Sequence, residues 1–92
     1  MTVRWTKPAA DDLAHICDYT EKRFGAAQAR RAAMALCDAA GTLKDLPRRG
    51  RAGRKPGTRE LTVAGLPFVI IYVAGKVAVE IIRILHGSQQ WP

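Results

Sequence analysis

The apolar run between Leu66 and Ala74 limits the fold of this chain more than any other feature of the sequence. Its centre, Phe68 to Val73, is apolar at consecutive positions, which is typical of a strand buried on both faces. The run is also far shorter than the roughly 18 apolar residues that a membrane-spanning helix requires. The sequence therefore predicts the central strand of a sheet rather than a membrane segment.

Other strand patterns accompany this central strand. Residues 59–63 alternate in polarity and precede it, and residues 77–85 form an apolar-rich segment that follows it. The intervening segments 64–67 and 74–76 contain glycine and read as tight turns, so the three strands are expected to form a meander. A further short strand is predicted at Thr2–Trp5, where apolar residues recur at every second position.

Two helical patterns lie between the first strand and the meander. The first begins after Thr6, whose hydroxyl can accept from free amides of the first turn, and it ends at Gly25. The second is predicted over residues 26–46 and is stopped by Pro47. Gly41 weakens its last turn, at a cost of about 1 kcal/mol relative to alanine. Because the linker is so short, the helices should pack as an antiparallel hairpin.

The predicted order of elements is β-α-α-β-β-β, which is an α+β fold. A helical hairpin that covers one face of an antiparallel sheet buries both apolar sets. A chain of 92 residues supports one modest core, so we expect a single domain over residues 1–92. The stretch Met1–Lys7 has no apolar segment typical of a secretory signal, and we therefore expect a cytoplasmic protein.

Positive charge is the most informative part of the composition. Fifteen Lys and Arg against eight Asp and Glu give a net charge of +7, which favours an anionic partner. Much of it falls in or beside the Gly-, Pro- and Arg-rich segment 47–57, which is predicted to be a loop. This segment is either a solvated loop kept open by charge repulsion or a binding surface. The basic residues are Lys44, Arg48, Arg49, Arg51, Arg54, Lys55 and Arg59.

Cysteine and histidine usage gives no sign of a metal or cofactor. Cys17 and Cys37 are too few for a disulfide framework or a cysteine metal site, and their helical context predicts small buried side chains. His15 has Tyr19, not a ligand, one helical turn later. We therefore expect neither a bound metal nor a cofactor.

Four short stretches of the sequence, taken together with this order of elements, are typical of one group of proteins. They are YTEKRFGAAQARR at residues 19–31, TREL at 58–61, PFVIIY at 67–72, and VEIIRILHGSQQWP at 79–92. Together they resemble the RelE/ParE superfamily of bacterial toxins, over nearly the whole chain. The resemblance implies the toxin half of a type II toxin–antitoxin pair, held silent by a protein antitoxin that wraps around it.

The resemblance leaves two molecular activities open. ParE-type members poison DNA gyrase without catalysis, whereas RelE-type members cut mRNA in the ribosome. The stretch at residues 19–31 resembles ParE more than RelE, and we favour gyrase inhibition. The positions after Phe68 and after the last strand, 69–71 and 87–90, lack the basic residues of RelE-type enzymes. An RNA-cutting member would need a base, an acid and phosphate-binding cations; the candidates are His86, Glu60, Arg59 and Arg83.

Each candidate also has a structural interpretation. Alternation along the last strand puts Arg83 and His86 on opposite faces, unless a bulge or the strand end intervenes. His86 is then expected to cap the strand end through a backbone carbonyl, and Arg83 to pair with an acidic group such as Asp18. Arg59 and Glu60 lie on opposite faces of their strand, as separate surface contacts, or Arg59 holds an acidic residue of the helical hairpin.

The resemblance also predicts the partner. We expect a cognate antitoxin with a DNA-binding N-terminal domain and an acidic, amphipathic segment that lies across the helical hairpin and the sheet edge, in a hetero-oligomer. The target is gyrase or the ribosome and its mRNA, with no role for a membrane. The expected target or antitoxin contacts are the basic loop and the chain end, namely Arg48, Arg49, Arg51, Arg54, Lys55, Arg59 and Trp91.

Overall fold

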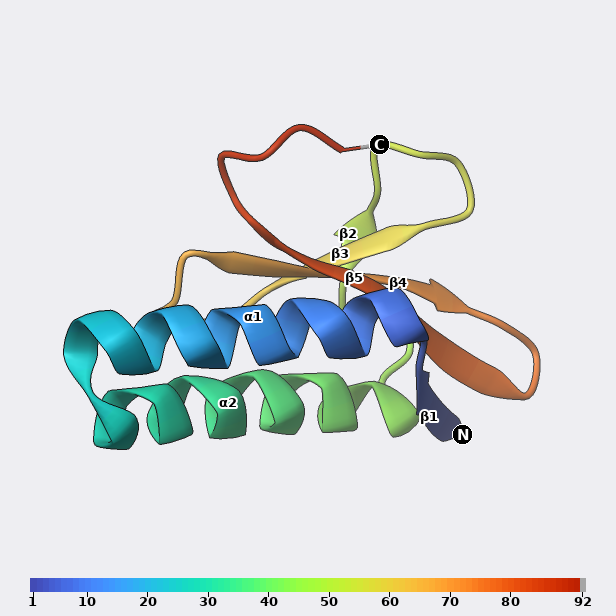
Figure 1. Ribbon diagram of the computed structural model, residues 1–92. Coiled ribbons are helices and arrows are strands. Elements are labelled where there is room, and N and C mark those ends of the chain that lie inside the picture. The colour runs from blue at the N-terminus through green and yellow to red at the C-terminus, as the bar shows by residue number, and fades with distance from the viewer. Residues whose placement is uncertain (92) are drawn as a thin grey trace.

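The computed structural model describes residues 1–91 and shows a five-stranded sheet with a pair of antiparallel helices against one face (Figure 1). The α+β fold and the predicted order of elements are confirmed, with one short strand added inside the basic segment. The elements are β1 (Thr2–Trp5), α1 (Lys7–Phe24), α2 (Ala26–Gly41), the 3-10 turn η1 (Thr42–Lys44), β2 (Arg51–Ala52), β3 (Arg59–Thr62), β4 (Phe68–Ala74) and β5 (Ala78–His86).

The sheet is mixed, because the first strand runs parallel to the last. The strand order is β1-β5-β4-β3-β2, and the pairs from β2 to β5 are antiparallel, as the predicted meander requires. β1 pairs with β5 in parallel, with Thr2 opposite Ala78 and Trp5 opposite Ile81. The expectation of a wholly antiparallel sheet is corrected at this edge. After the helical hairpin and the meander, the chain comes back beside β1 as β5 and runs in the same direction as β1. The long connection between the two strands allows this parallel pairing.

The start of α1 is fixed to the sheet through its capping residue. The Thr6 hydroxyl accepts from the Ala9 amide at 3.3 Å and donates to the Ile81 carbonyl at 2.8 Å. The Thr6 amide donates to the same carbonyl at 3.1 Å. The predicted cap therefore also connects the helix to β5. Gly25, with φ 93°, joins the two helices in a conformation that favours glycine.

The second helix is shorter than predicted. It ends at Gly41 rather than Leu46, and the chain continues through the 3-10 turn. The Thr42 hydroxyl donates to the Ala39 carbonyl at 2.6 Å, so a side chain satisfies one carbonyl of the last turn. The glycine predicted to weaken the last turn is therefore where the α-helix ends.

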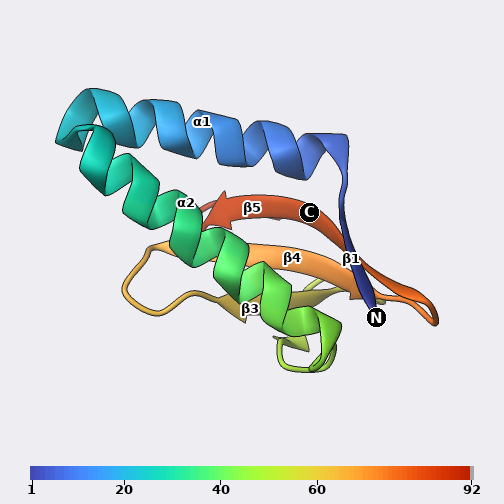
Figure 2. The same cartoon turned by 90° about the horizontal axis from the view of Figure 1, so that it is seen from below.

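The core lies mainly between the helices and the sheet. Figure 2 shows α2 crossing the sheet diagonally, over β4 and β3, while α1 runs alongside β5. The α2 residues Leu36 and Ala40 are buried in the core between the two layers. β4 is buried on both faces, as predicted: Ile70 and Tyr72 point toward the helices, and Val69 and Ile71 point to the outer face. The helix-side core is Ala9, Leu36, Ala40, Leu43, Leu61, Val63, Ile70, Tyr72, Val79, Ile81 and Ile84.

A β-bulge interrupts the pairing of β4 with β5. Tyr72 lies opposite Ile81 and Ile71 lies opposite Arg83, so Ile82 is an extra residue in β5. The bulge falls just beyond the point where β1 stops pairing with β5. The sequence carries no glycine or proline there to mark it.

The bulge changes which side chains of β5 share a face. The alternation that the sequence predicted, if carried through the whole strand, would place Ile81 and Leu85 on one face and Ile84 on the other. In the structure Ile84 joins Ile81 on the helix side, and Leu85 belongs to the outer cluster. The predicted faces are therefore wrong beyond Ile81. Arg83 and His86, which both follow the bulge, still start from opposite faces of the strand.

The two cysteines lie on different helices, and the prediction of burial is wrong for one of them. Cys17 is half-buried on α1, whereas Cys37 is exposed on α2. Partial burial of its sulfur, with Cys17 and Asp38 nearby, raises the pKa of the Cys37 thiol. The thiol of Cys37 is therefore protonated at neutral pH and a weak nucleophile.

Candidate functional site

The basic loop, defined here as residues 47–58, is tied to the sheet by a tyrosine of β4. The buried Tyr72 hydroxyl donates to the Pro47 carbonyl and accepts from the Gly50 amide, both at 2.8 Å. A Cβ on Gly50 would lie 2.7 Å from the Tyr72 ring, so only glycine fits this approach. These contacts fix the path of the loop as it enters β2.

Glu60 of β3 is the second anchor of the basic loop, and it is not the surface residue that the sequence predicted. Its side chain is 2% exposed and accepts from the Arg51 guanidinium at 3.2 Å and from the Arg54 amide at 3.1 Å. The Arg54 guanidinium lies 3.5 Å from the same carboxylate. One buried carboxylate therefore holds two arginines.

The environment of Glu60 keeps it ionised. Burial alone would raise the pKa of its carboxyl, but the hydrogen bonds from the Arg54 amide and the Arg51 side chain, with the two positive charges, bring that pKa below its ordinary value. A buried acid with a lowered pKa is a weak base, which makes it a poor acceptor for the proton of an RNA hydroxyl.

Arg59, the other candidate on β3, also holds the basic loop. Its guanidinium donates to the Gly50 carbonyl at 2.8 Å and to the Arg48 carbonyl at 3.5 Å. It therefore bonds backbone oxygens rather than a carboxylate of the helical hairpin, which was the alternative the sequence suggested. The side chains of Tyr72, Arg59 and Glu60 together attach the loop to β3 and β4.

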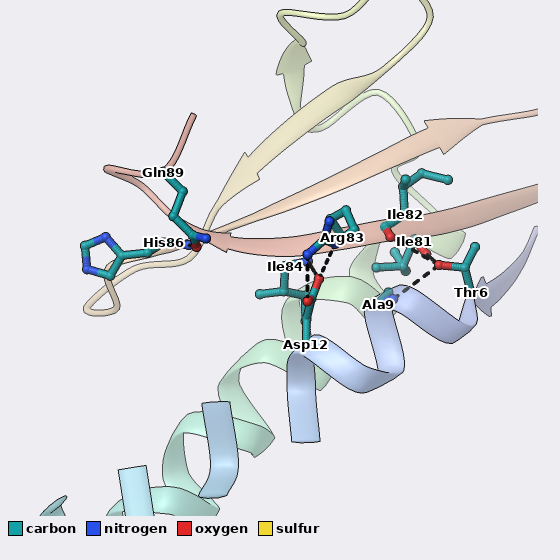
Figure 3. Close-up of polar contacts among 9 residues, drawn as sticks. All are labelled: Thr6, Ala9, Asp12, Ile81, Ile82, Arg83, Ile84, His86 and Gln89. Carbon is teal, nitrogen blue, oxygen red and sulfur yellow. Dashed lines mark hydrogen bonds and ion pairs between the residues drawn. The ribbon is translucent and has the colours of Figure 1, made fainter. Parts of the chain in front are cut away.

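Arg83 forms a bidentate ion pair with α1 (Figure 3). Its Nε and Nη2 atoms donate to the two oxygens of Asp12, at 2.7 and 3.0 Å. Asp12 also accepts from the Ile84 amide at 3.0 Å, on the edge of β5 that β1 does not reach. The hydrogen bond to Asp12 raises the pKa of Arg83 further. The predicted partner, Asp18, pairs instead with Lys22 one helical turn away, at 3.0 Å.

His86 lies at the end of β5 and points away from Arg83 (Figure 3). Its Nδ1 atom accepts from the Ser88 amide at 3.2 Å and lies 2.8 Å from the Ser88 hydroxyl. Its ring packs edge-on against Phe68, with centroids 6.0 Å apart. The amide donor places the proton of the neutral ring on Nε2. The predicted cap is present, but it forms with Ser88 rather than a backbone carbonyl.

The four residues considered for RNA cleavage are thus placed in three separate sets of contacts. Glu60 and Arg59 anchor the basic loop, Arg83 pairs with α1, and His86 lies near Phe68 on the helix side. The structure brings Glu60 together with Arg51 and Arg54 instead. This arrangement organises a charged surface and does not assemble a base, an acid and free cations around one position.

The outer face of the sheet carries a small cluster next to the basic loop. Trp91 is half-buried against Val69, Ile71 and Leu85, as its predicted packing role requires. The Lys55 ammonium lies 5.9 Å from the centroid of the Trp91 ring, within the range of a cation–π contact. The chain end and the tip of the basic loop therefore meet on the face opposite the helices.

The remaining loop arginines are exposed. Arg49 donates to the Thr42 hydroxyl at 2.8 Å, which ties the start of the loop to η1. Arg48 contributes its carbonyl to Arg59, while its side chain is exposed. Together with Lys55, these residues leave positive charge at the surface that no carboxylate among residues 1–91 compensates by an ion pair.

A cleft on the helix side is the feature that the sequence analysis missed. It lies between α1, α2 and the turn from β3 to β4, holds about 530 Å³, and is lined mainly by apolar atoms. Tyr19 and Phe24, 58% and 66% exposed, lie along it, and the Arg23 guanidinium lies over both rings, at 5.6 and 5.9 Å. The sequence did contain a signal for this cleft, because Tyr19 and Phe24 are large aromatic residues near the helical turn that the core does not need.

The described part of the chain gives no candidate for a metal centre or a membrane segment. Among residues 1–91, no three His, Cys, Asp or Glu side chains gather in a way that could bind a metal ion. Neither α1 nor α2 combines the length and the apolar character needed to cross a membrane.

Comparison with known proteins identifies relatives across nearly the whole chain. Residues 3–91 match the family model described as the ParE toxin of the type II toxin–antitoxin system parDE. The chain is 40% identical over 90 residues to the candidate toxin Y4kP of Sinorhizobium fredii, covering 98% of this chain and 92% of that one. It is 39% identical over 87 residues to toxin RelE2 of Caulobacter vibrioides, covering 95% and 96%.

A solved structure gives the same result for the fold. A chain described as part of the chromosomal ParDE toxin–antitoxin system from P. aeruginosa superposes with a TM-score of 0.88 and 28% identity, covering 94% of this chain and 95% of that one. The mixed sheet and the helical hairpin described above are thus shared with a chain from a toxin–antitoxin system.

Proposed function

The chain belongs to the ParE toxin family of type II toxin–antitoxin systems, and from that membership we propose that it inhibits DNA gyrase by binding rather than by cutting RNA. As a toxin of this family it has a cognate antitoxin as its partner. We propose that the toxin meets both its target and its antitoxin in the cytoplasm.

One observation carries the choice of gyrase: the groups needed for RNA cleavage are engaged elsewhere. Glu60 is buried between two arginines, and Arg83 is held by both oxygens of Asp12. A metal-free nuclease needs a proton acceptor and cations that are free to contact one phosphate. An inhibitor that acts by binding needs only an exposed surface.

RNA cleavage is the second candidate, and it too has a specific observation in its favour. The hydrogen bond from Ser88 to Nδ1 of His86 leaves Nε2 without a hydrogen-bond partner among residues 1–91. One relative at 39% identity also carries the name RelE2. This alternative requires His86 to be essential, which the gyrase proposal does not.

The test compares the wild-type toxin with His86→Ala in two assays. In the first, purified gyrase and supercoiled DNA are incubated with toxin, and cleaved DNA is measured after protein denaturation. We expect both proteins to increase the cleaved DNA to a similar extent. In the second, a cell-free translation reaction reports mRNA length, which should stay unchanged. Rapid shortening of mRNA by the wild type but not by His86→Ala would contradict the gyrase proposal and establish the alternative.

For the antitoxin, we propose that the apolar face of its acidic, amphipathic segment occupies the helix-side cleft. The exposed rings of Tyr19 and Phe24 offer the apolar contacts that such a segment needs, and Arg23 lies beside them. Because the toxin carries a net charge of +7, added salt should slow association more than it speeds dissociation. Stopped-flow rates that do not change with salt would contradict electrostatic steering.

A further inference from the structure

The positive charge of the protein is concentrated in the segment that leads into the basic loop and through it to β3. Between residues 44 and 60 there are seven Lys or Arg and two Asp or Glu, which gives +5 of the +7 carried by the whole chain. In Figure 1 the basic loop and the chain end rise from the sheet on the side opposite α1 and α2. This surface is thus separate from the apolar cleft.

Three cations of this surface are fixed before any partner arrives. The Arg51 and Arg54 guanidinium groups lie 3.2 and 3.5 Å from oxygens of the same buried carboxylate, Glu60. Their side chains nevertheless remain 65% and 48% exposed, so each guanidinium has donors left for a ligand. The Lys55 ammonium lies over the ring of Trp91. Fixing side chains in advance lowers the entropy lost on binding.

The character of this surface discriminates between anionic partners. An amphipathic peptide needs exposed apolar contacts, and the helix-side cleft offers them, whereas the apolar side chains of the outer cluster, including Trp91, are buried or half-buried. Duplex DNA instead presents about one negative charge per 1.7 Å of helix axis and binds through cations alone. Arginine forks also match phosphate oxygens in two-point hydrogen bonds.

The geometry points to Arg51, Arg54 and Lys55 as a binding surface for the phosphate backbone of duplex DNA. The inference rests on the proposed function for its biological role. It deepens that function because gyrase acts on bound DNA, and a toxin with this surface would contact the enzyme and its DNA together. It assigns the outer face of the sheet to nucleic acid and leaves the helix-side cleft for the antitoxin. Such binding would be independent of DNA sequence, since within residues 1–91 this surface offers charge and no helix that would enter a groove.

The test measures binding of purified toxin to a fluorescein-labelled 20-base-pair DNA duplex by anisotropy, over a series of salt concentrations. The variant is Arg54→Gln/Lys55→Gln, in which Arg51 and the Arg54 amide still hold Glu60. The matched control is Arg30→Gln/Arg31→Gln, an exposed arginine pair on α2 with the same loss of charge. Thermal melting of each protein verifies that it is folded.

We expect the loop variant to bind at least about tenfold more weakly near physiological salt, and its log–log salt slope to fall by about 2, one for each phosphate contact removed. The control pair should change the slope by much less. Equal losses for the two variants would show attraction by net charge alone and would overturn the inference. Absence of binding by the wild-type protein would also overturn it.

Two competitors identify the class of ligand. Unlabelled duplex DNA should displace the labelled duplex, and polyglutamate at the same charge concentration should not. Equal displacement by polyglutamate would assign the surface to acidic polypeptides instead, and tenfold tighter binding of an RNA duplex of the same sequence would assign it to RNA. Either result would overturn the assignment to DNA.

A gyrase assay separates this inference from the proposed function. If wild-type toxin binds DNA as expected but leaves gyrase unaffected, the gyrase proposal fails while the DNA surface stands. If Arg54→Gln/Lys55→Gln loses DNA binding yet inhibits gyrase as well as the wild type does, the DNA surface stands, but its proposed role in inhibition is overturned.

Discussion

The two faces of the sheet are stabilised in different ways. Eleven buried residues form the core between the sheet and the helices, whereas three buried residues, with Ile82 and Trp91 beside them, cover the outer face. The helix side therefore gains most of the apolar burial that stabilises the fold. The outer face depends more on polar contacts, because the buried carboxylate of Glu60 holds the basic loop there, while Tyr72 and Arg59 hold the start of the same loop from the helix side.

The largest effect that tests this difference is expected from truncation of one leucine on each face. Leu36→Ala, in the helix-side core, should lower the free energy of unfolding by about 3–4 kcal/mol, because the buried site cannot collapse around the cavity. Leu85→Ala, in the thin outer cluster, should cost about 2 kcal/mol, at the low end for a buried leucine. Urea unfolding followed by circular dichroism measures both, and equal losses would show that the two faces stabilise the fold equally.

The next effect concerns the connection between the core and the basic loop. Tyr72→Phe keeps the ring in the core but removes the bonds to Pro47 and Gly50, and should cost about 1–3 kcal/mol because the buried Gly50 amide loses its acceptor. Tyr19→Phe, at an exposed position on α1, is the matched control and should change stability by less than about 0.5 kcal/mol. A loss from Tyr72→Phe no larger than that of the control would mean that the loop is not held through this hydroxyl.

A smaller effect distinguishes Asp12, the observed partner of Arg83, from Asp18, the partner that the sequence suggested. Asp12→Ala removes three hydrogen bonds and should cost about 1–2 kcal/mol, less than a fully buried pair because Arg83 is partly exposed to solvent. Asp18→Ala breaks only an exposed pair with Lys22 and should cost a few tenths of a kcal/mol.

A double-mutant cycle with Arg83→Gln completes this comparison. The cycle should give a coupling energy for Asp12 with Arg83 and none for Asp18 with Arg83. Coupling between Arg83 and Asp18 would contradict the observed pairing and restore the partner that the sequence suggested.

The elements of the fold could be predicted because each has a local signal. Consecutive apolar residues marked β4, and Thr6 and Gly25 marked the limits of α1. The need to bury the apolar sets of the helices and of the strands predicted that the hairpin covers one face of the sheet. The direction of β1 could not be derived from local pattern, because it depends on where a distant strand, β5, leaves an edge free.

The contacts of the site were harder to predict, because most of them join residues far apart in the sequence. Asp12 and Arg83 are 71 residues apart, and several other acidic residues of α1 were equally plausible partners from spacing alone. The bulge at Ile82 has no glycine or proline to announce it. The burial of Glu60 depends on the basic loop folding back over β3, which its composition did not indicate.

The smallest effect we expect is a pH dependence that belongs to the outer face. Because the pKa of Glu60 is lowered in the folded state, its ionised form stabilises the protein above the unfolded value of about 4.3. This contribution is lost as the pH falls through the folded-state pKa. The effect should be modest, since burial opposes the lowering by the two arginines.

Comparison with Glu60→Gln isolates this contribution from the other carboxylates. The free energy of unfolding, measured from pH 7 to pH 3, should differ between the wild type and Glu60→Gln at neutral pH, and the difference should shrink as the pH falls below about 4.3. Glu80→Gln, at an exposed position on β5, should follow the wild type throughout. A gap for Glu60→Gln that stays constant with pH would mean that the two arginines hold the loop without depending on the charge of Glu60, and the outer face would then resemble the helix side in relying on packing.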